Sequence, residues 1–296
     1  MRNIFLFLII SLFFACGGSK EIIKTTQTNQ NPQNVSESEI SESPQVIDKP
    51  IEETPVEEKI IEEPSEITET AIESKETLEV ETKEAFDHNS WNDLLKKYVA
   101  IDGTVNYKGF KRDRSFKNYL SLLSENIPDE TWTKEDKLAY WMNAYNAFTI
   151  KLIINNYPLK SIKDINEPWD LRFFKLGKKW YTLNDLEHRI LRKMGDPRIH
   201  FGINCASFSC PPLLNKAFTA QNVDQELEKL AVTFINDSKR NIISTNSIKI
   251  SKIFSWFAKD FKTKGSLIDF LNTYSKIRIK DNASISYKTY DWNLNE

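Results

Sequence analysis

The spacing of apolar side chains predicts amphipathic helices from residue 91 onward. Trp91, Leu94, Leu95 and Tyr98 recur at i, i+3, i+4 and i+7, which places them on one face of a helix. The same spacing predicts a second helix from Phe116 to Leu123. Both helices have polar residues on the opposite face, so we expect each to cover a core on one side only.

A longer helix is expected over residues 134–155, with Thr133 as its N-cap. Its sequence is apolar on nearly all faces, and a helix of that kind is buried. Asn143 and Asn146 interrupt the apolar run. Buried amides need hydrogen-bond partners, so we expect each to brace a loop or to face a site.

Alternating polar and apolar residues predict short strands in the second half of the chain. A hairpin is expected over residues 173–183 around Gly177, a second over residues 241–250, and a closing strand over residues 285–292. The residues before Cys205 also alternate, and they predict a strand from Arg198 to Cys205. The chain therefore indicates an α+β fold: a helix-rich single domain with a small, mainly antiparallel sheet.

Composition divides the chain into a tether and a folded domain. Residues 37–84 carry 17 acidic residues against four lysines and hold no aromatic side chain. Such a segment cannot bury enough apolar surface to offset its ordering entropy. We predict a disordered acidic tether over residues 16–85 and a folded domain over residues 86–296.

The first residues have the pattern of an export signal. One early arginine precedes an unbroken apolar run that ends in Ala15-Cys16-Gly17. A cysteine in this place resembles a bacterial lipobox, which implies a signal peptide over residues 1–15 and lipidation of Cys16. An ordinary signal peptide with an incidental cysteine is the alternative. We expect a lipoprotein of the cell envelope, anchored to a membrane and facing the periplasm or the cell exterior.

The charge of the folded part suggests a partner class. Residues 91–296 contain 33 basic and 23 acidic residues. A basic body on an acidic tether can approach an anionic envelope polymer or surface, or the tether can fold back on it; simple solubility is the plainer explanation. The export signal argues against nucleic acid as the partner. The chain shows no glycine-rich phosphate loop, so we expect no dinucleotide cofactor, and the oligomeric state stays open.

Groups with reactive chemistry gather in residues 183–213. This stretch holds His188, His200, Cys205 and Cys210, with Glu187 beside the first histidine. We expect a helix from about Asp185 to Lys193, capped by Asn184 or Thr182, to carry the Glu-His pair. If the protein has a chemical site, most of it lies here.

Three interpretations of the two cysteines are open. In an exported protein they can form a structural disulfide. One of them can instead be a nucleophile, which needs a base and a group that orients the base. The third is zinc bound by His188, His200, Cys205 and Cys210, but their spacing fits no standard finger, so we predict no metal.

For a catalytic site we choose Cys205 as nucleophile, because it precedes a loop of small residues, whereas Cys210 is fixed by Pro211. His200 should point away from Cys205 on the predicted strand. His188 is therefore the preferred base and His200 the second choice. The supporting group is Glu187 or Asn143, with Asn146 and Asp185 also available.

Several ordered blocks of the chain resemble the domain-of-unknown-function family 547. They include Ala139 to Ala147, Leu183 to Arg192, Arg198 to Phe201, and Asn204 to Pro211 with its two cysteines; Phe254 to Phe261 and Tyr290 to Asn295 resemble the C-terminal part. The resemblance runs over about residues 90–296. It implies Asn143, Glu187, His188, His200, Cys205 and Cys210 as signature positions. The family is named for its lack of an assigned activity.

Two functions remain in view. The first is a thiol-dependent hydrolase or acyl transferase with a Cys-His-Glu site, acting on a carbonyl substrate such as a peptide, amide or thioester. The order of these residues differs from that in papain-like and transglutaminase enzymes, where the cysteine precedes the histidine. The second is a non-catalytic binding module of the cell envelope with a structural Cys205–Cys210 disulfide.

Overall fold

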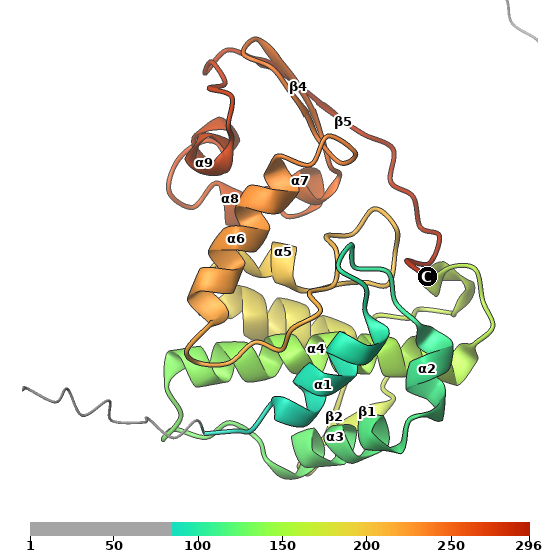
Figure 1. Ribbon diagram of the computed structural model, residues 1–296. Coiled ribbons are helices and arrows are strands. Elements are labelled where there is room, and N and C mark those ends of the chain that lie inside the picture. The colour runs from blue at the N-terminus through green and yellow to red at the C-terminus, as the bar shows by residue number, and fades with distance from the viewer. Residues whose placement is uncertain (1–84) are drawn as a thin grey trace, which may run out of the picture. The chain divides into compact units, whose positions relative to one another are not determined.

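The computed structural model describes residues 85–296, which belong to one compact unit. The predicted signal peptide, Cys16 and nearly all of the acidic tether lie outside the described residues. Within the described part, no helix has the length and apolar character needed to cross a membrane. The fold is helix-rich α+β, as the sequence predicts (Figure 1).

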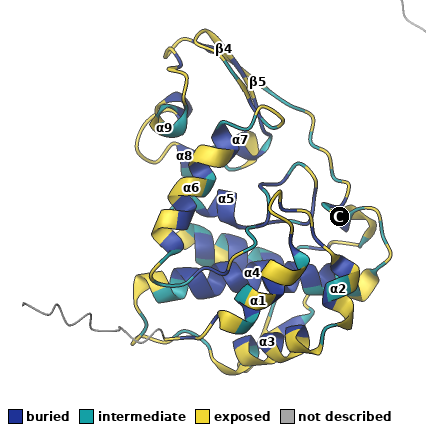
Figure 2. Cartoon of the chain, viewed as in Figure 1, coloured by how far each residue is buried: buried dark blue, intermediate teal, exposed yellow. Residues whose placement is uncertain are grey.

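One long helix organises the first half of the described chain. α4 (Lys134–Asn156) begins at Thr133, whose hydroxyl accepts a hydrogen bond from the Asp136 amide at 3.0 Å, as predicted for an N-cap. The helix is buried along most of its length (Figure 2). Three shorter helices pack around it: α1 (Asn89–Tyr98), α2 (Tyr107–Arg112) and α3 (Arg114–Glu125). Between α1 and α2, Val99 and Val105 form an isolated antiparallel bridge.

The second half forms its own apolar cluster above α4. Its helices are α6 (Val223–Ile235), α7 (Ile253–Trp256), α8 (Ala258–Phe261) and α9 (Leu267–Tyr274). Phe201 packs with Phe234, Phe254 and Phe261 in this cluster, while its chain neighbours belong to the core around α4. The segment around Phe201 therefore joins the two cores.

The strands form two small sheets. β1 (Phe174–Leu176) and β2 (Lys179–Tyr181) make the first predicted hairpin, antiparallel across Gly177. β3 (Ile242–Ile243) and β4 (Ser247–Ile250) make the second. β5 (Ser284–Tyr287) adds to β4 in parallel. Both hairpins were predicted, because turn chemistry and alternation are local signals. The closing strand, predicted over residues 285–292, is shorter than expected and ends at Tyr287.

The predicted strand from Arg198 to Cys205 is wrong. The structure has a short helix there, α5 (Ile199–Gly202), all of whose residues are buried. Asp196 accepts the Arg198 amide at 2.9 Å, which holds the first turn in place. A short stretch that is buried on all sides carries no usable period, so its apparent alternation was misleading.

The helix predicted from Asp185 to Lys193 is not an α-helix. Residues Asp185–Ile190 (η2) form a π-helix, and Leu191–Met194 (η3) continue as a 3-10 turn that ends at Gly195. Of the two predicted caps, Thr182 is the one used: its hydroxyl accepts the Asp185 amide at 3.0 Å. π-helical turns are rare and are often found at functional sites.

The last seven residues cross back over the loop that carries the cysteines. The amide of Phe208 donates to the Asn293 carbonyl at 2.7 Å, and the amide of Val105 donates to the Asn295 carbonyl at 2.7 Å. We call residues 290–296 the C-terminal strap. It connects β5 with the helices around α4, and it brings Tyr290 and Trp292 to the site described next.

Candidate functional site

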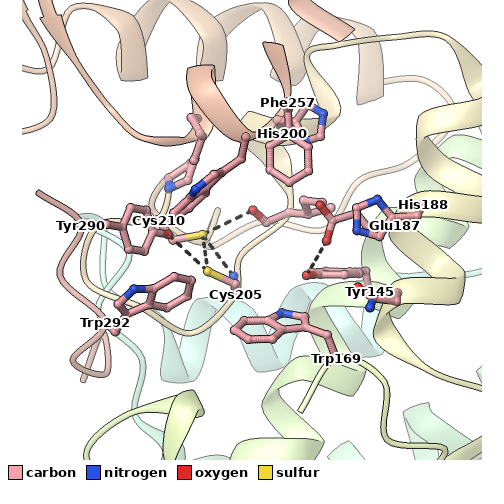
Figure 3. A pocket seen from close by; sticks show the side chains of 15 residues that line it. Tyr145, Trp169, Glu187, His188, His200, Cys205, Cys210, Phe257, Tyr290 and Trp292 are labelled. Carbon is pink, nitrogen blue, oxygen red and sulfur yellow. Dashed lines mark hydrogen bonds between the residues drawn. The ribbon is translucent and has the colours of Figure 1, made fainter. Parts of the chain in front are cut away.

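A pocket of about 230 Å³ brings the predicted site residues together. Glu187, His188, His200 and Cys205 all line it, as does Cys210. Figure 3 shows the two cysteines on one side and Glu187 with His188 on the other. The reactive groups of residues 183–213 therefore converge on one cavity.

Aromatic side chains form much of the wall. Trp256 contacts Tyr290 and Trp292, with ring centroids 4.8 and 5.6 Å apart, and Trp169 meets Trp292 at 5.7 Å. These rings come from a loop, from α7 and from the C-terminal strap. An aromatic wall of this kind favours apolar or planar groups and keeps bulk water away from the thiol.

Cys205 lies in a tight turn after α5. The Ala206 amide donates to Oδ1 of Asn204 at 2.8 Å, and Ala206 has a left-handed backbone with φ of 61°. This conformation turns the chain back, so that Ser207 Oγ comes within 3.2 Å of the Cys205 sulfur. The sequence prediction of a small-residue loop after Cys205 agrees with this geometry.

The environment of Cys205 favours its thiolate. Hydrogen bonding to Cys210, whose sulfur is 3.1 Å away, lowers the pKa of Cys205 to about 7 against the opposing effect of burial. Ser207 and the hydroxyl of Tyr290, 3.4 Å from the sulfur, act in the same direction. Burial raises the pKa of Tyr290 well above its usual value, so this phenol keeps its proton and can donate it.

Cys210 differs from Cys205 in exposure and acidity. It is buried, and burial together with the neighbouring thiol raises its pKa well above the usual value. Both cysteines are free in the structure. The Cys205–Cys210 disulfide, which was one of the sequence-based alternatives, is therefore not formed here; the two sulfurs interact as thiols.

Glu187 is the acid of the opposite wall. Burial raises its pKa to about 7, against a hydrogen bond from the Tyr145 hydroxyl, which lies 3.0 Å from Oε2. A carboxyl with this pKa can both give and take a proton near neutral pH. Tyr145 comes from the buried face of α4, and the sequence pattern did not single it out.

His188, the predicted base, is held in the wrong state for that role. Its Nδ1 lies 2.7 Å from a guanidinium nitrogen of Arg192. Arginine can only donate, so Nδ1 must accept and the ring proton resides on Nε2. Burial and the charge of Arg192 lower the pKa of His188. The ring is therefore a neutral hydrogen-bond donor, and no hydrogen bond in the described chain links it to Cys205.

His200 is arranged as a base would be. Its Nε2 lies 2.8 Å from Oδ2 of Asp260, which also accepts two hydrogen bonds from Arg192 at 2.6 and 2.8 Å. A carboxylate on Nε2 leaves Nδ1 as the acceptor of the neutral ring. Burial lowers the pKa of His200 despite Asp260, and the ring stacks on Phe257 at 3.9 Å.

The expectation that His200 points away from Cys205 is wrong, because it depended on a strand where the structure has α5. With a helical turn at residues 199–202, His200 and Cys205 line the same pocket. The carboxylate that orients His200 is Asp260, from α8. Asp260 lies 60 residues further along the chain, and no sequence pattern assigns it a role beyond its place in a block resembling the family.

Asn143 does not line the pocket. Its amide group donates to the Phe218 carbonyl at 2.7 Å and accepts the Phe218 amide at 3.1 Å. Asn146 makes a similar brace, to the Gly202 carbonyl at 3.0 Å and the Asn204 amide at 2.9 Å. Both asparagines thus brace loops, one of the two roles expected for them, and the predicted catalytic support from Asn143 is not seen.

Two other predictions for the site can be compared with the structure. Asp185 pairs with Thr182 and Arg189 at the start of η2 and orients no histidine. Among residues 85–296, no group of three or more His, Cys, Asp and Glu side chains is placed to hold a metal ion.

A comparison with protein-family models finds a match in the middle of the chain. Residues 130–235 match the family model described as "Protein of unknown function, DUF547". This segment of the chain is therefore similar to the DUF547 family. The match contains α4, η2, the π-helical Glu187-His188 pair and both cysteines, so the resemblance predicted from these blocks is confirmed over residues 130–235. No curated protein and no solved structure matches the chain.

The DUF547 match ends before two parts of the pocket. Asp260, Trp256, Tyr290 and Trp292 lie beyond residue 235. The matched segment supplies the thiols, Glu187 and both histidines. The residues that orient His200, contact the Cys205 sulfur and complete the aromatic wall come from the C-terminal part of the described chain.

Proposed function

We propose that this protein is a thiol-dependent hydrolase or acyl transferase with Cys205 as nucleophile. The observation that carries the proposal is that Cys205 and Glu187 line one pocket together with both histidines. The surroundings lower the pKa of the thiol and raise that of the carboxyl. Such convergence of oppositely shifted groups is typical of acid–base sites. A thiol with this pKa is about half ionised at neutral pH and needs no direct imidazole partner.

The reaction follows from these groups. The Cys205 thiolate attacks the carbonyl carbon, forming a C–S bond, while the bond to the leaving group breaks and Glu187 protonates that group. A thioester on Cys205 and a Glu187 carboxylate result. Water then attacks the thioester, Glu187 accepts its proton, and the C–S bond breaks to restore the thiolate. An acyl transferase uses an amine or alcohol in place of water.

The histidines have different roles in this scheme. His188 offers an N–H donor, suited to the oxygen that becomes negative in the tetrahedral intermediate. His200, oriented by Asp260, is a second proton acceptor for the attacking water. The aromatic wall made by Trp169, Trp256 and Trp292 favours an apolar or planar acyl group.

The test uses the full chain under reducing conditions, with p-nitrophenyl esters of acetate and phenylacetate as probes. We expect turnover with both, faster with phenylacetate, and an acyl group on Cys205 by peptide mass mapping. Cys205→Ala should abolish both signals, whereas Cys16→Ala, the matched control, should change neither. Wild-type turnover by Cys205→Ala, or acyl groups found elsewhere, would overturn the proposal.

A carboxyl variant separates the two steps. Glu187→Gln should still be acylated by these activated esters, whose leaving group needs little protonation. Its deacylation should slow by roughly 100-fold or more, because general base catalysis supplies about that factor. Equal rates of both steps in Glu187→Gln and wild type would remove Glu187 from the mechanism.

The site of action is also a proposal. We infer from residues 1–16 that the protein is a lipoprotein anchored through Cys16 and acting at the cell envelope, where the basic domain can meet an anionic polymer or surface. Detergent-phase partitioning tests the anchor: the wild type should enter the detergent phase, and Cys16→Ala should stay in the aqueous phase. Equal partitioning of the two would exclude a lipid on Cys16.

A further inference from the structure

The two cysteines have an arrangement that acyl transfer does not require. Their sulfurs are 3.1 Å apart, and a disulfide bond of about 2.05 Å needs an approach of only about 1 Å. Both cysteines line the pocket, but Cys205 is half-buried whereas Cys210 is buried. A more accessible thiol beside a buried one is the geometry of an attacking and a resolving cysteine.

We propose that Cys205 and Cys210 also perform thiol–disulfide exchange, reducing a small or peptide-borne disulfide and closing a bond between themselves. The proposal goes beyond the acyl-transfer function and does not depend on it. The substrate disulfide is the oxidant, so no cofactor is needed. A pocket of about 230 Å³ admits a small disulfide or one on an extended peptide, and excludes a disulfide inside a folded domain.

The electrons and protons balance over two steps. The Cys205 thiolate attacks one sulfur of the substrate, the substrate S–S bond breaks, and a mixed disulfide forms as one thiolate leaves and takes a proton. The Cys210 sulfur then attacks the Cys205 sulfur, losing its own proton to the second leaving thiolate. Two substrate thiols are produced, and the protein dithiol becomes one disulfide.

The loop favours the second step. The Cys205 amide donates a hydrogen bond to the Cys210 sulfur at 3.1 Å, which stabilises negative charge on that sulfur as it attacks. Burial is the main cause of the raised pKa of Cys210, and the neighbouring Cys205 thiolate raises it further; the contribution from Cys205 disappears once Cys205 is in a mixed disulfide. The Cys210 thiol is therefore a weak acid in the resting dithiol protein, and it becomes more acidic in the mixed disulfide.

The turn between the cysteines keeps the pair in register. Only four residues separate them, and the Asn204–Ala206 hydrogen bond with the left-handed Ala206 fixes the reversal. Asn204 is itself held by a bond from its side-chain amide to the Pro211 carbonyl at 2.8 Å. Because both ends of the loop are anchored, the sulfurs stay opposed and their effective concentration for each other is high.

The experiment treats full-length protein with glutathione disulfide and maps its cysteines by peptide mass analysis. In wild type we expect a Cys205–Cys210 disulfide, two glutathione thiols released per chain, and little persistent adduct. In Cys210→Ser we expect glutathione to remain on Cys205, with one thiol released. Cys205→Ser should give neither product at these positions. Near-UV circular dichroism checks that each variant keeps its tertiary packing.

Two outcomes would overturn the exchange proposal. The first is a stable glutathione adduct on Cys205 in wild type, which would show that Cys210 does not resolve it. The second is reaction at Cys205 no faster than in urea-unfolded chain at the same pH. The first outcome is measured on wild type alone, so the exchange proposal can be tested even if a cysteine variant misfolds. Ester turnover under reducing conditions reports separately on the acyl-transfer proposal.

Discussion

The hydroxyl of Tyr145 donates a hydrogen bond to Oε2 of Glu187 at 3.0 Å, deep in the wall opposite the cysteines. The bond favours the ionised carboxylate, but burial outweighs it and leaves the pKa of Glu187 raised to about 7. The carboxyl is thus kept protonated at a pH where most glutamates are charged, at a cost to the folded state whenever it ionises.

Glu187→Gln should therefore stabilise the protein at alkaline pH. A folded pKa of about 7, against an unfolded value of about 4.5, means that wild type loses about 3 kcal/mol as the pH rises from 4.5 through 7. Urea unfolding should give equal stabilities for wild type and variant near pH 4.5, and an advantage of about 3 kcal/mol for the variant at pH 8.

The matched control is Glu226→Gln. Glu226 is also buried, but Lys216 and Lys229 lie 3.1 and 3.3 Å from it. Although burial opposes the shift, these lysines lower its pKa. Its replacement should bring no gain at pH 8. A gain in both variants would point to a general effect of removing acidic residues.

Tyr290→Phe should make Cys205 less acidic. The phenol is one of the hydrogen-bonding groups around the sulfur, and a hydrogen bond to a charged group contributes about 1.5 kcal/mol. The midpoint of Cys205 alkylation by iodoacetamide should therefore move from about 7 to about one pH unit higher. Tyr287→Phe, on β5 and without a contact to the thiol, should leave the midpoint unchanged. If Tyr290→Phe leaves the pH profile of Cys205 alkylation unchanged, the C-terminal strap does not contribute to the acidity of the thiol.

Asp260→Asn should destabilise the fold and misplace His200. Asp260 accepts hydrogen bonds from both Arg192 and His200, and its loss leaves the buried His200 and the partly exposed Arg192 without their charge partner. We expect a loss of about 2 kcal/mol, less than for a fully buried ion pair because Arg192 and Asp260 are partly exposed. Asp224→Asn, which affects a highly exposed partner of Arg198, should cost much less.

The pH dependence of the Asp260 effect has a defined sign. Although burial opposes it, the bonds from His200 and Arg192 hold the pKa of Asp260 well below its usual range. Stability from this carboxylate is therefore present above pH about 4 and is lost as the pH falls below that value. The difference between wild type and Asp260→Asn should shrink on acidification; a difference that stays constant would assign the cost to packing.

Asn143→Ala should cost stability without changing the thiol. Both main-chain groups of Phe218 lose their buried partner, which costs about 2 kcal/mol. The alkylation rate of Cys205 in the folded variant should equal that of wild type. Asn146→Ala should change both properties, because Asn146 holds the Asn204 amide next to Cys205. If Asn143→Ala alters the reactivity of the Cys205 thiol, Asn143 does contribute to the site.

The sequence predicts the parts of this protein that depend on neighbouring residues. The Thr133 cap, α4 and both hairpins follow from periodicity and turn chemistry, and the Glu187, His188, His200 and Cys205 cluster follows from a local density of reactive groups. The alternation of residues 198–205 predicted a strand where the structure has a helical turn, because a turn that is buried on all sides shows no helical period.

Contacts over long distances in the chain could not be predicted in the same way. Tyr290 reaches Cys205 across 85 residues, and Asp260 reaches His200 across 60. No periodic or compositional signal marks either residue as a partner. The state of His188 was likewise out of reach, because it depends on which atom Arg192 contacts. Sequence reasoning found the reactive groups but not the neighbours that set their protonation.

The positions of Tyr290 and Trp292 along the chain set an order of events during biosynthesis. Both are synthesised after Cys205, so a growing chain carries this thiol before it has the phenol that helps to ionise it or the Trp292 ring that lines its pocket. The thiol is thus less acidic in a nascent chain. It gains its full acidity only when residues 290–292 have been made and have docked beside it, which limits side reactions before the fold is in place.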